Sequence, residues 1–264
     1  MLRVGIALVA IALLAAIVGP WVTPLDPSVQ QLALRLAGPS PAHPFGLDEL
    51  GRDIFARVMA GARISFLVGL VVVGVSASVG TLLGAVAGYY GGAIDDAISR
   101  VIDVLLAFPG LLLAIALVAV LGPSLGNVLF ALTVIGWVGY ARLVRGQVLR
   151  AREFEYVQAA RALGADTTRV LWRHVIPTAI PAVVVQSTLG MAGAILGEAA
   201  LSFLGLGVQP PTPSWGTMLN GGRSHLLDAP HLTIFPGLAI ALLVLGFNFL
   251  GDGLRDLTDP KSLR

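Results

Sequence analysis

Long apolar segments that are almost free of charge constrain the fold of this chain more than any other feature of its sequence. Hydrophobic residues make up 56% of the chain and charged residues only 12%, about half the charged share of a typical soluble domain. A helix needs roughly 20 apolar residues to cross about 30 Å of hydrocarbon. The sequence therefore predicts an all-α, polytopic membrane protein with about six transmembrane helices. The predicted spans are residues 4–22, 64–90, 104–121, 127–141, 175–206 and 232–251, of which the fourth is expected to be the shortest.

The spans divide the chain into an N-terminal part and a larger core. Residues 1–62 hold the first transmembrane helix and an extracytoplasmic segment, and residues 63–264 hold the core. Within the extracytoplasmic segment a separate helix is expected from Asp48 to Met59, because acidic residues at its start suit the helix dipole. In the third span Pro109 removes a backbone hydrogen bond, which predicts a kink that could act as a hinge.

Lysine and arginine residues are distributed unequally between the two sides of this topology. Seven of the 17 lie between Arg142 and Arg173, and five of the other ten are on the same side. Positive residues favour the cytoplasmic side of a membrane, so both termini and residues 142–173 are expected in the cytoplasm. The net charge of +2 and the pI near 9.4 then reflect topology and contact with lipid headgroups, and no nucleic-acid partner is expected. The remaining cytoplasmic cations in this count are Arg3, Arg100, Arg255, Lys261 and Arg264.

Between the fourth and fifth spans, residues 155–177 have the pattern of two short helices joined by a tight turn. One helical face is formed by residues spaced i, i+3, i+4 and i+7. Gly164 is typical of a left-handed helix end, Asp166 of a helix N-cap, and Pro177 of a stop or kink. We interpret this segment as a docking element at the membrane surface, where small side chains would let another protein approach closely. The residues of that face are Tyr156, Ala159, Ala160 and Leu163.

Small and acidic residues in the spans suggest how the helices pack. Gly80, Gly84 and Gly88 recur every four residues, a spacing that lets helices approach closely in lipid, and packing inside the bundle explains it fully. Asp95, Asp96 and Asp103 flank Arg100 at helical distances, which predicts local ion pairs on an interfacial helix. Glu198 lies at membrane depth, where an acid either organises the bundle by hydrogen bonding or faces a water-filled path.

Several kinds of chemistry are missing from the sequence. A phosphate-binding loop needs a lysine after glycine, but the one lysine is Lys261, which follows Pro260. The chain has no cysteine, none of its four histidines lies in a predicted span, and no metal-ligand spacing is present. An enzyme is therefore not expected. An ATP-driven importer subunit, an ion-coupled secondary transporter or channel, and a structural scaffold remain open on these grounds.

Residues 155–177 resemble the cytoplasmic EAA loop of ABC-importer permeases. That pattern is Glu-Ala-Ala, three residues, Gly, nine residues, an apolar residue, one residue and Leu-Pro. The chain keeps the spacing with Ala159 and Ala160, Gly164 and Pro177, but Gln158 replaces the acid and His174 the apolar residue. Glu155 could supply the acid instead. Further blocks, HPFGLDELGRDIF, GYARLVRGQVL, RHVIP and LSFLGLGVQPPTPSWG, are similar to C-type permeases of the dipeptide, oligopeptide and nickel group, over roughly residues 43–260.

The resemblance implies a type I ABC-importer permease-like bundle in a bacterial inner membrane, with a cytoplasmic coupling helix in a coupling loop at residues 153–177. The implied partners are a B-type permease in a heterodimer, cytoplasmic ABC ATPases and an extracytoplasmic solute-binding protein. ATP and Mg²⁺ would be bound by the ATPases and no cofactor or metal by this chain, and the cargo would be dipeptides or oligopeptides. The implied ATPase-coupling residues are Glu155, Tyr156, Gln158, Ala159, Ala160, Arg161, Leu163, Gly164 and Asp166.

Overall fold

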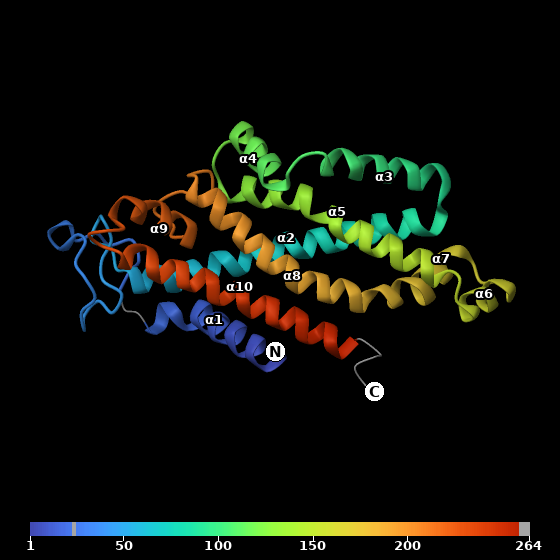
Figure 1. The fold of residues 1–264 in the computed structure, drawn as a ribbon, viewed down its shortest axis with the longest axis horizontal. Coiled ribbons are helices and arrows are strands. Elements are labelled where there is room, and N and C mark those ends of the chain that lie inside the picture. The colour runs from blue at the N-terminus through green and yellow to red at the C-terminus, as the bar shows by residue number, and fades with distance from the viewer. Residues whose placement is uncertain (23–24, 259–264) are drawn as a thin grey trace.

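The computed structural model describes residues 1–22 and 25–258 and is an elongated bundle of helices (Figure 1). Lys261 and Arg264 of the charge count lie outside the described residues. The helices are α1 (Leu2–Val22), α2 (Ile54–Tyr90), α3 (Gly92–Leu106), α4 (Gly110–Leu121), α5 (Leu125–Ala151), α6 (Glu155–Ala162), α7 (Thr167–Val170), α8 (Ile176–Phe203), α9 (Trp215–Gly222) and α10 (His231–Thr258), with 3₁₀ turns η1 (Leu32–Leu34) and η3 (Arg223–His225) and a π-helical segment η2 (Leu171–Val175).

Five helices in the described part of the chain are long and apolar enough to cross a membrane, and a sixth crossing is counted if α3 and α4 form one bent span. Figure 1 shows α6 and α7 at one end of the bundle and α9 with the segment before α2 at the other. The N-terminal end of α1 and the C-terminal end of α10 both point toward the end of the bundle that holds α6. The all-α fold with about six spans is therefore confirmed.

The third span differs from the prediction in its shape. Pro109 does not kink one helix: it stands as the N-cap of α4, and α3 and α4 meet at an angle of 83°. The break follows from the missing proline N–H, which cannot continue the hydrogen-bond ladder of α3. The expected order of lengths was also wrong, because α5 has 27 residues whereas α4 has 12.

The expected separate helix from Asp48 to Met59 is wrong as well. The chain becomes helical only at Ile54, where Asp53 caps the helix by accepting a 2.7 Å hydrogen bond from the Ala56 N–H, and α2 then continues for 37 residues. No proline interrupts α2. At Gly61 the ring of Trp215 packs directly against the helix, in the space that a side chain would fill. The predicted division between residues 62 and 63 lies within α2.

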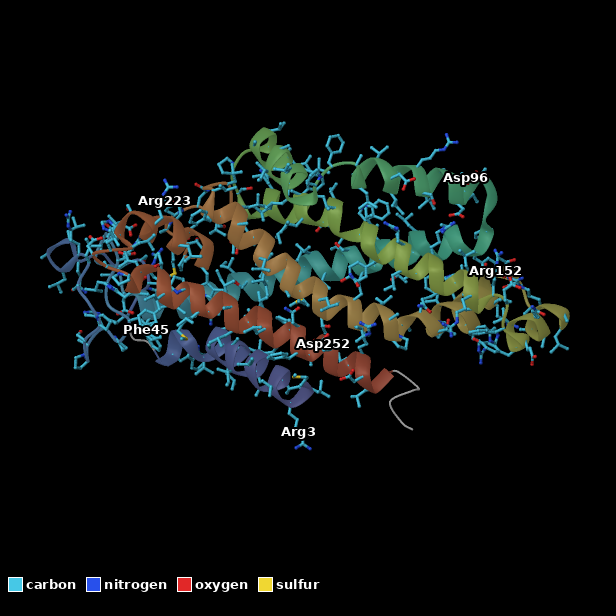
Figure 2. The ribbon with its side chains drawn as sticks, in the orientation of Figure 1. Arg3, Phe45, Asp96, Arg152, Arg223 and Asp252 are labelled. Atoms are coloured by element: carbon cyan, nitrogen blue, oxygen red, sulfur yellow. The ribbon has the colours of Figure 1, made fainter. Side chains whose placement is uncertain are left out.

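The segment before α2 folds back onto the end of the bundle instead of forming a helix of its own. Asp48 accepts a hydrogen bond from Arg52 Nε at 2.7 Å, and His43 Nδ1 lies 2.8 Å from Asp53. The ring of Phe45 stacks on Phe235 of α10 with centroids 3.9 Å apart. These contacts fix the position of the segment, which Figure 2 shows with Phe45 at the end opposite Arg152.

The close packing of α2 on α5 explains the glycine repeat. A Cβ atom at Gly80 would lie 2.5 Å from the Trp137 carbonyl oxygen, and one at Gly88 would lie 2.8 Å from that of Arg145. At Gly84 it would clash with the carbonyl of Ala141. The three glycines thus serve packing inside this chain, as the sequence indicated.

One ion pair joins α3 to α5. Arg145 donates two hydrogen bonds to the Asp95 carboxylate, from Nε at 2.5 Å and from Nη2 at 2.6 Å. The expected pairing of Asp95 with Arg100 is therefore wrong: the guanidinium that reaches Asp95 comes from a helix distant in sequence. This bidentate pair fixes the start of α3 against α5.

Candidate functional site

The segment between α5 and α8 forms the two-helix element that its sequence predicts. Helix α6 ends in a Schellman arrangement: the Gly164 N–H donates to the Arg161 carbonyl at 2.9 Å, and the Ala165 N–H donates to the Ala160 carbonyl at 3.1 Å. Gly164 has φ +84°, the left-handed conformation that glycine adopts without strain. Asp166 then caps α7 by accepting a 2.6 Å hydrogen bond from the Arg169 N–H.

The second helix of the element runs directly into the membrane. The chain stays helical from α7 through the π-helical segment Leu171–Val175 into α8, and Pro177 lies in the first turn of α8. The helix does not stop at Pro177, so the expected helix end there is wrong. Because proline has no N–H to donate, the wider π turn just before α8 accommodates it without ending the helix. Helix α7 is consequently joined to the transmembrane helix α8 by continuous helical backbone.

Most of the predicted face of α6 is exposed. Leu163 is 88% exposed and Tyr156 47% exposed, Ala159 is exposed and Ala160 is half-buried. We call these four residues the coupling face. Tyr156 and Leu163 thus leave apolar side chains exposed on this short helix.

A different residue of α6 anchors the helix to the bundle. Val157 has no exposed surface and packs in a cluster that includes Ala85 of α2, Val148 of α5 and Ala179 of α8. The sequence pattern did not single out Val157, whose cluster includes residues far from it in the chain. Val157 therefore packs α6 into a cluster that also contains Val170 of α7 and Leu171 of η2.

Polar contacts hold the element at its edges. The Tyr156 hydroxyl donates to the His174 carbonyl at 3.2 Å, which joins α6 to η2. The Arg161 guanidinium lies over the ring of Tyr89 at 4.9 Å, a cation–π contact with the end of α2. Figure 2 shows Arg152 at this same end of the molecule, where its Nη1 donates to the Gly88 carbonyl at 3.4 Å.

The two polar positions of the loop pattern have different surroundings. The Gln158 side-chain amide donates to the Glu153 carbonyl at 3.3 Å, a local bond that joins α6 to the preceding turn. Glu155 is exposed in the first turn of α6, where a negative charge suits the helix dipole. Both side chains are exposed.

Glu198 is a hydrogen-bonded acid of the bundle. Its side chain is 1% exposed, and Ser202 Oγ donates to Oε1 at 2.6 Å while accepting a bond from the Val208 N–H at 3.2 Å. The acid thereby fixes the turn after α8. Among the described residues no group of three or more histidine, aspartate or glutamate side chains could hold a metal ion.

Comparison with known proteins decides which kind of protein carries this element. Residues 80–264 match the family described as "Binding-protein-dependent transport system inner membrane component". The chain belongs to this family. It is a multi-pass permease subunit of a binding-protein-dependent ABC importer of the inner membrane. None of the similarities supports the ion-coupled transporter or channel that the sequence left open.

Curated relatives cover nearly the whole chain. The dipeptide transport system permease protein DppC of Alkalihalophilus pseudofirmus is 48% identical over 98% of this chain and 85% of its own length. The glutathione transport system permease protein GsiD of Pectobacterium atrosepticum is 50% identical over 85% of the chain and 74% of its own. The probable D,D-dipeptide transport system permease protein DdpC of Escherichia coli K12 is 44% identical over 97% and 86%.

A solved structure has the same fold. A chain of the MetNI methionine ABC transporter in an inward-facing conformation superposes with a TM-score of 0.63 at 18% identity, over 77% of this chain and 97% of that one. The similarity confirms the permease-like bundle predicted from sequence.

The turn at Gly164 offers a direct test of how the element is built. We expect Gly164→Val to destabilise the α6–α7 turn by about 1–2 kcal/mol, because a β-branched residue is strained at φ +84°. Amide hydrogen exchange across α6 should then become faster, while exchange in α10 stays unchanged. Gly164→Asn is the matched control, since asparagine tolerates the left-handed region, and equal exchange rates in both variants would contradict the assignment.

Proposed function

We propose that the α6–α7 element is the site at which a cytoplasmic ATPase drives this permease. The observation that carries the proposal is the coupling face: an exposed apolar surface on a short helix whose Val157 is buried among α2, α5 and α8. The chain has no phosphate-binding loop of its own, so ATP and Mg²⁺ are bound in a partner subunit. The coupling residues are the nine of the α6 region predicted from sequence, with Glu155 as the acid in place of Gln158.

The orientation follows from the same site. An ATPase that uses cellular ATP contacts the cytoplasmic end, so α6 and α7 face the cytoplasm, as do both termini. The excess of arginine between Arg142 and Arg173 supports this orientation. At the opposite end, α9 and the segment before α2 face the outside and receive a solute-binding protein.

The cargo that we propose is a short peptide. The named cargoes of the relatives are dipeptides, a D,D-dipeptide and glutathione, which share peptide amides and a free carboxylate. A second, B-type permease completes the path in a heterodimer, and movement of α6 and α7 switches the pair between outward-facing and inward-facing states.

Reconstitution tests this function. The chain, its B-type permease, the ATPases and the solute-binding protein are placed in proteoliposomes, and ATP hydrolysis is measured with a panel of dipeptides and oligopeptides. We expect hydrolysis to rise when the binding protein and a peptide are both present, and labelled peptide to accumulate with ATP. Uptake driven by an ion gradient without ATP would contradict the proposal.

A further inference from the structure

Helix α3 is joined to its neighbours in the chain by a break in the helical backbone at each end. At its start, Gly91 and Gly92 have φ angles of +65° and +53°, and a Cβ atom added at either glycine would meet nothing within 4 Å. At its end, Pro109 separates α3 from α4, and the two helices meet at 83°. Glycines with free space around them can absorb changes in backbone dihedral angles, so the backbone allows α3 to move as a unit.

Apolar packing holds α3 to the bundle over a small area. Of its 15 residues only Ile102 is buried, and it packs in a cluster with Val138 and Ala141 of α5. Figure 1 shows α3 along the outside of the bundle. A helix with few buried apolar side chains opens at a low cost in free energy, so the packing alone does not fix its position firmly.

An ion pair fixes the start of α3 more precisely than this packing does. The Arg145 guanidinium binds both oxygens of the Asp95 carboxylate, and no other ion pair joins α3 to a second helix within residues 1–22 and 25–258. The side chains of Asp95 and Arg145 are 15% and 37% exposed. Because water reaches both groups, opening of the pair does not leave an unpaired charge in a dry interior. The pair is therefore suited to break and form again.

The glycine pair at the start of α3 lies beside the α6–α7 element. The Arg161 guanidinium of α6 lies 4.9 Å from the centre of the Tyr89 ring, and Arg152 Nη1 donates to the Gly88 carbonyl at 3.4 Å. Both contacts are made at the end of α2, directly before Gly91. A shift of α6 would therefore change the contacts of the backbone that leads into α3.

We infer that α3 is a hinged segment with two positions, that the Asp95–Arg145 pair locks it in the position of this structure, and that movement of the α6–α7 element opens the lock. The inference rests on the proposed function and adds to it a part of the permease that the ATPase moves. With the pair open, α3 turns about Gly91 and Gly92 and about the break at Pro109. Helices α2 and α5 stay together, because their close backbone contacts at Gly84 do not depend on the pair.

Two spin labels test the movement directly. The chain has no cysteine, so Leu82→Cys on α2 and Val101→Cys on α3 place labels at these two exposed positions, with the other subunits made cysteine-free. Double electron–electron resonance gives the distance between the labels in the reconstituted complex, first without nucleotide and then with a non-hydrolysable ATP analogue and the solute-binding protein. We expect a second distance to appear with nucleotide, shifted by about 5 Å, one helical turn.

Asp95→Asn and Asp96→Asn are the matched variants that test the lock. Each removes one carboxylate charge, but Arg145 bonds to Asp95, whereas Asp96 is exposed beside it near the turn between α2 and α3 (Figure 2). Without nucleotide, Asp95→Asn should increase the share of the second distance at least fivefold, roughly the lower end of typical coupling between two states. Asp96→Asn should leave that share at the wild-type value. The exchanged pair, Asp95→Arg with Arg145→Asp, should restore the wild-type distances, which separates loss of the lock from misfolding.

The outcomes distinguish the inference from the proposed function. If the wild-type complex imports peptide with ATP but a single distance persists in every state and variant, the inference is wrong. It is also wrong if the Asp95→Asn and Asp96→Asn complexes give the same distances. If the wild-type complex imports peptide without ATP, the proposed function fails and the inference with it.

Discussion

Replacement of Gly84 by leucine is expected to prevent the formation of a stable bundle. The Cβ atom alone would collide with the backbone carbonyl of Ala141 on α5, and a backbone atom in a packed helix pair cannot move aside as a side chain can. Overpacking of a core costs about 1–3 kcal/mol where side chains can adjust, and we expect a cost above that range here. The measurement is the amount of monodisperse protein and its thermal unfolding in detergent, compared with the wild type.

Gly74→Leu provides the control for Gly84→Leu, because it makes the same chemical change on the same helix. A Cβ atom at Gly74 meets nothing within 4 Å, so we expect wild-type yield and unfolding temperature. A Gly84→Leu protein as stable as the Gly74→Leu protein would show that α2 and α5 do not pack as described.

Replacement of Ala159 by arginine is expected to abolish ATP-driven uptake while leaving the permease folded. Ala159 is exposed on the coupling face and contributes nothing to the buried cluster around Val157. An arginine there places a long cation in an interface that small side chains leave open for close approach, where an unpaired buried charge is costly. We expect the ATPase to be lost on co-purification and uptake to fall to the level without ATP.

Ala97→Arg is the matched control for this change. Ala97 is exposed on α3, outside the coupling face and outside the Asp95–Arg145 pair, so it adds the same cation elsewhere on the protein. This variant should retain both ATPase and uptake. If the Ala159→Arg complex still co-purifies with the ATPase, the coupling face is not where the ATPase docks.

Features set by local chemistry could be predicted from the sequence. The spans follow from long uncharged segments, and the helix end at Gly164 and the cap at Asp166 follow from the conformational preferences of those two residues. The packing role of Gly84 was also predictable, because small residues at four-residue spacing allow membrane helices to pack closely.

Features set by contacts between distant residues could not be predicted. The partner of Asp95 is Arg145, 50 residues away, and nothing near Asp95 in the sequence indicates it. Val157 is buried in a cluster that draws on α2, α5, α7, η2 and α8, so the sequence indicated only the exposed face of α6. The angle of 83° at the α3–α4 break likewise depends on where the bundle holds the two helices, whereas proline alone predicts only an interruption.

The most direct test of the central claim, that an ATPase acts on this permease from the cytoplasm through α6, uses the single-cysteine variant Ala159→Cys. A membrane-impermeant thiol reagent is applied to intact cells and to inside-out vesicles, with and without the ATPase subunits bound. We predict labelling only in inside-out vesicles, and strong protection when the ATPase is present. Labelling from outside the cell, or labelling in vesicles that the bound ATPase does not reduce, would contradict the account.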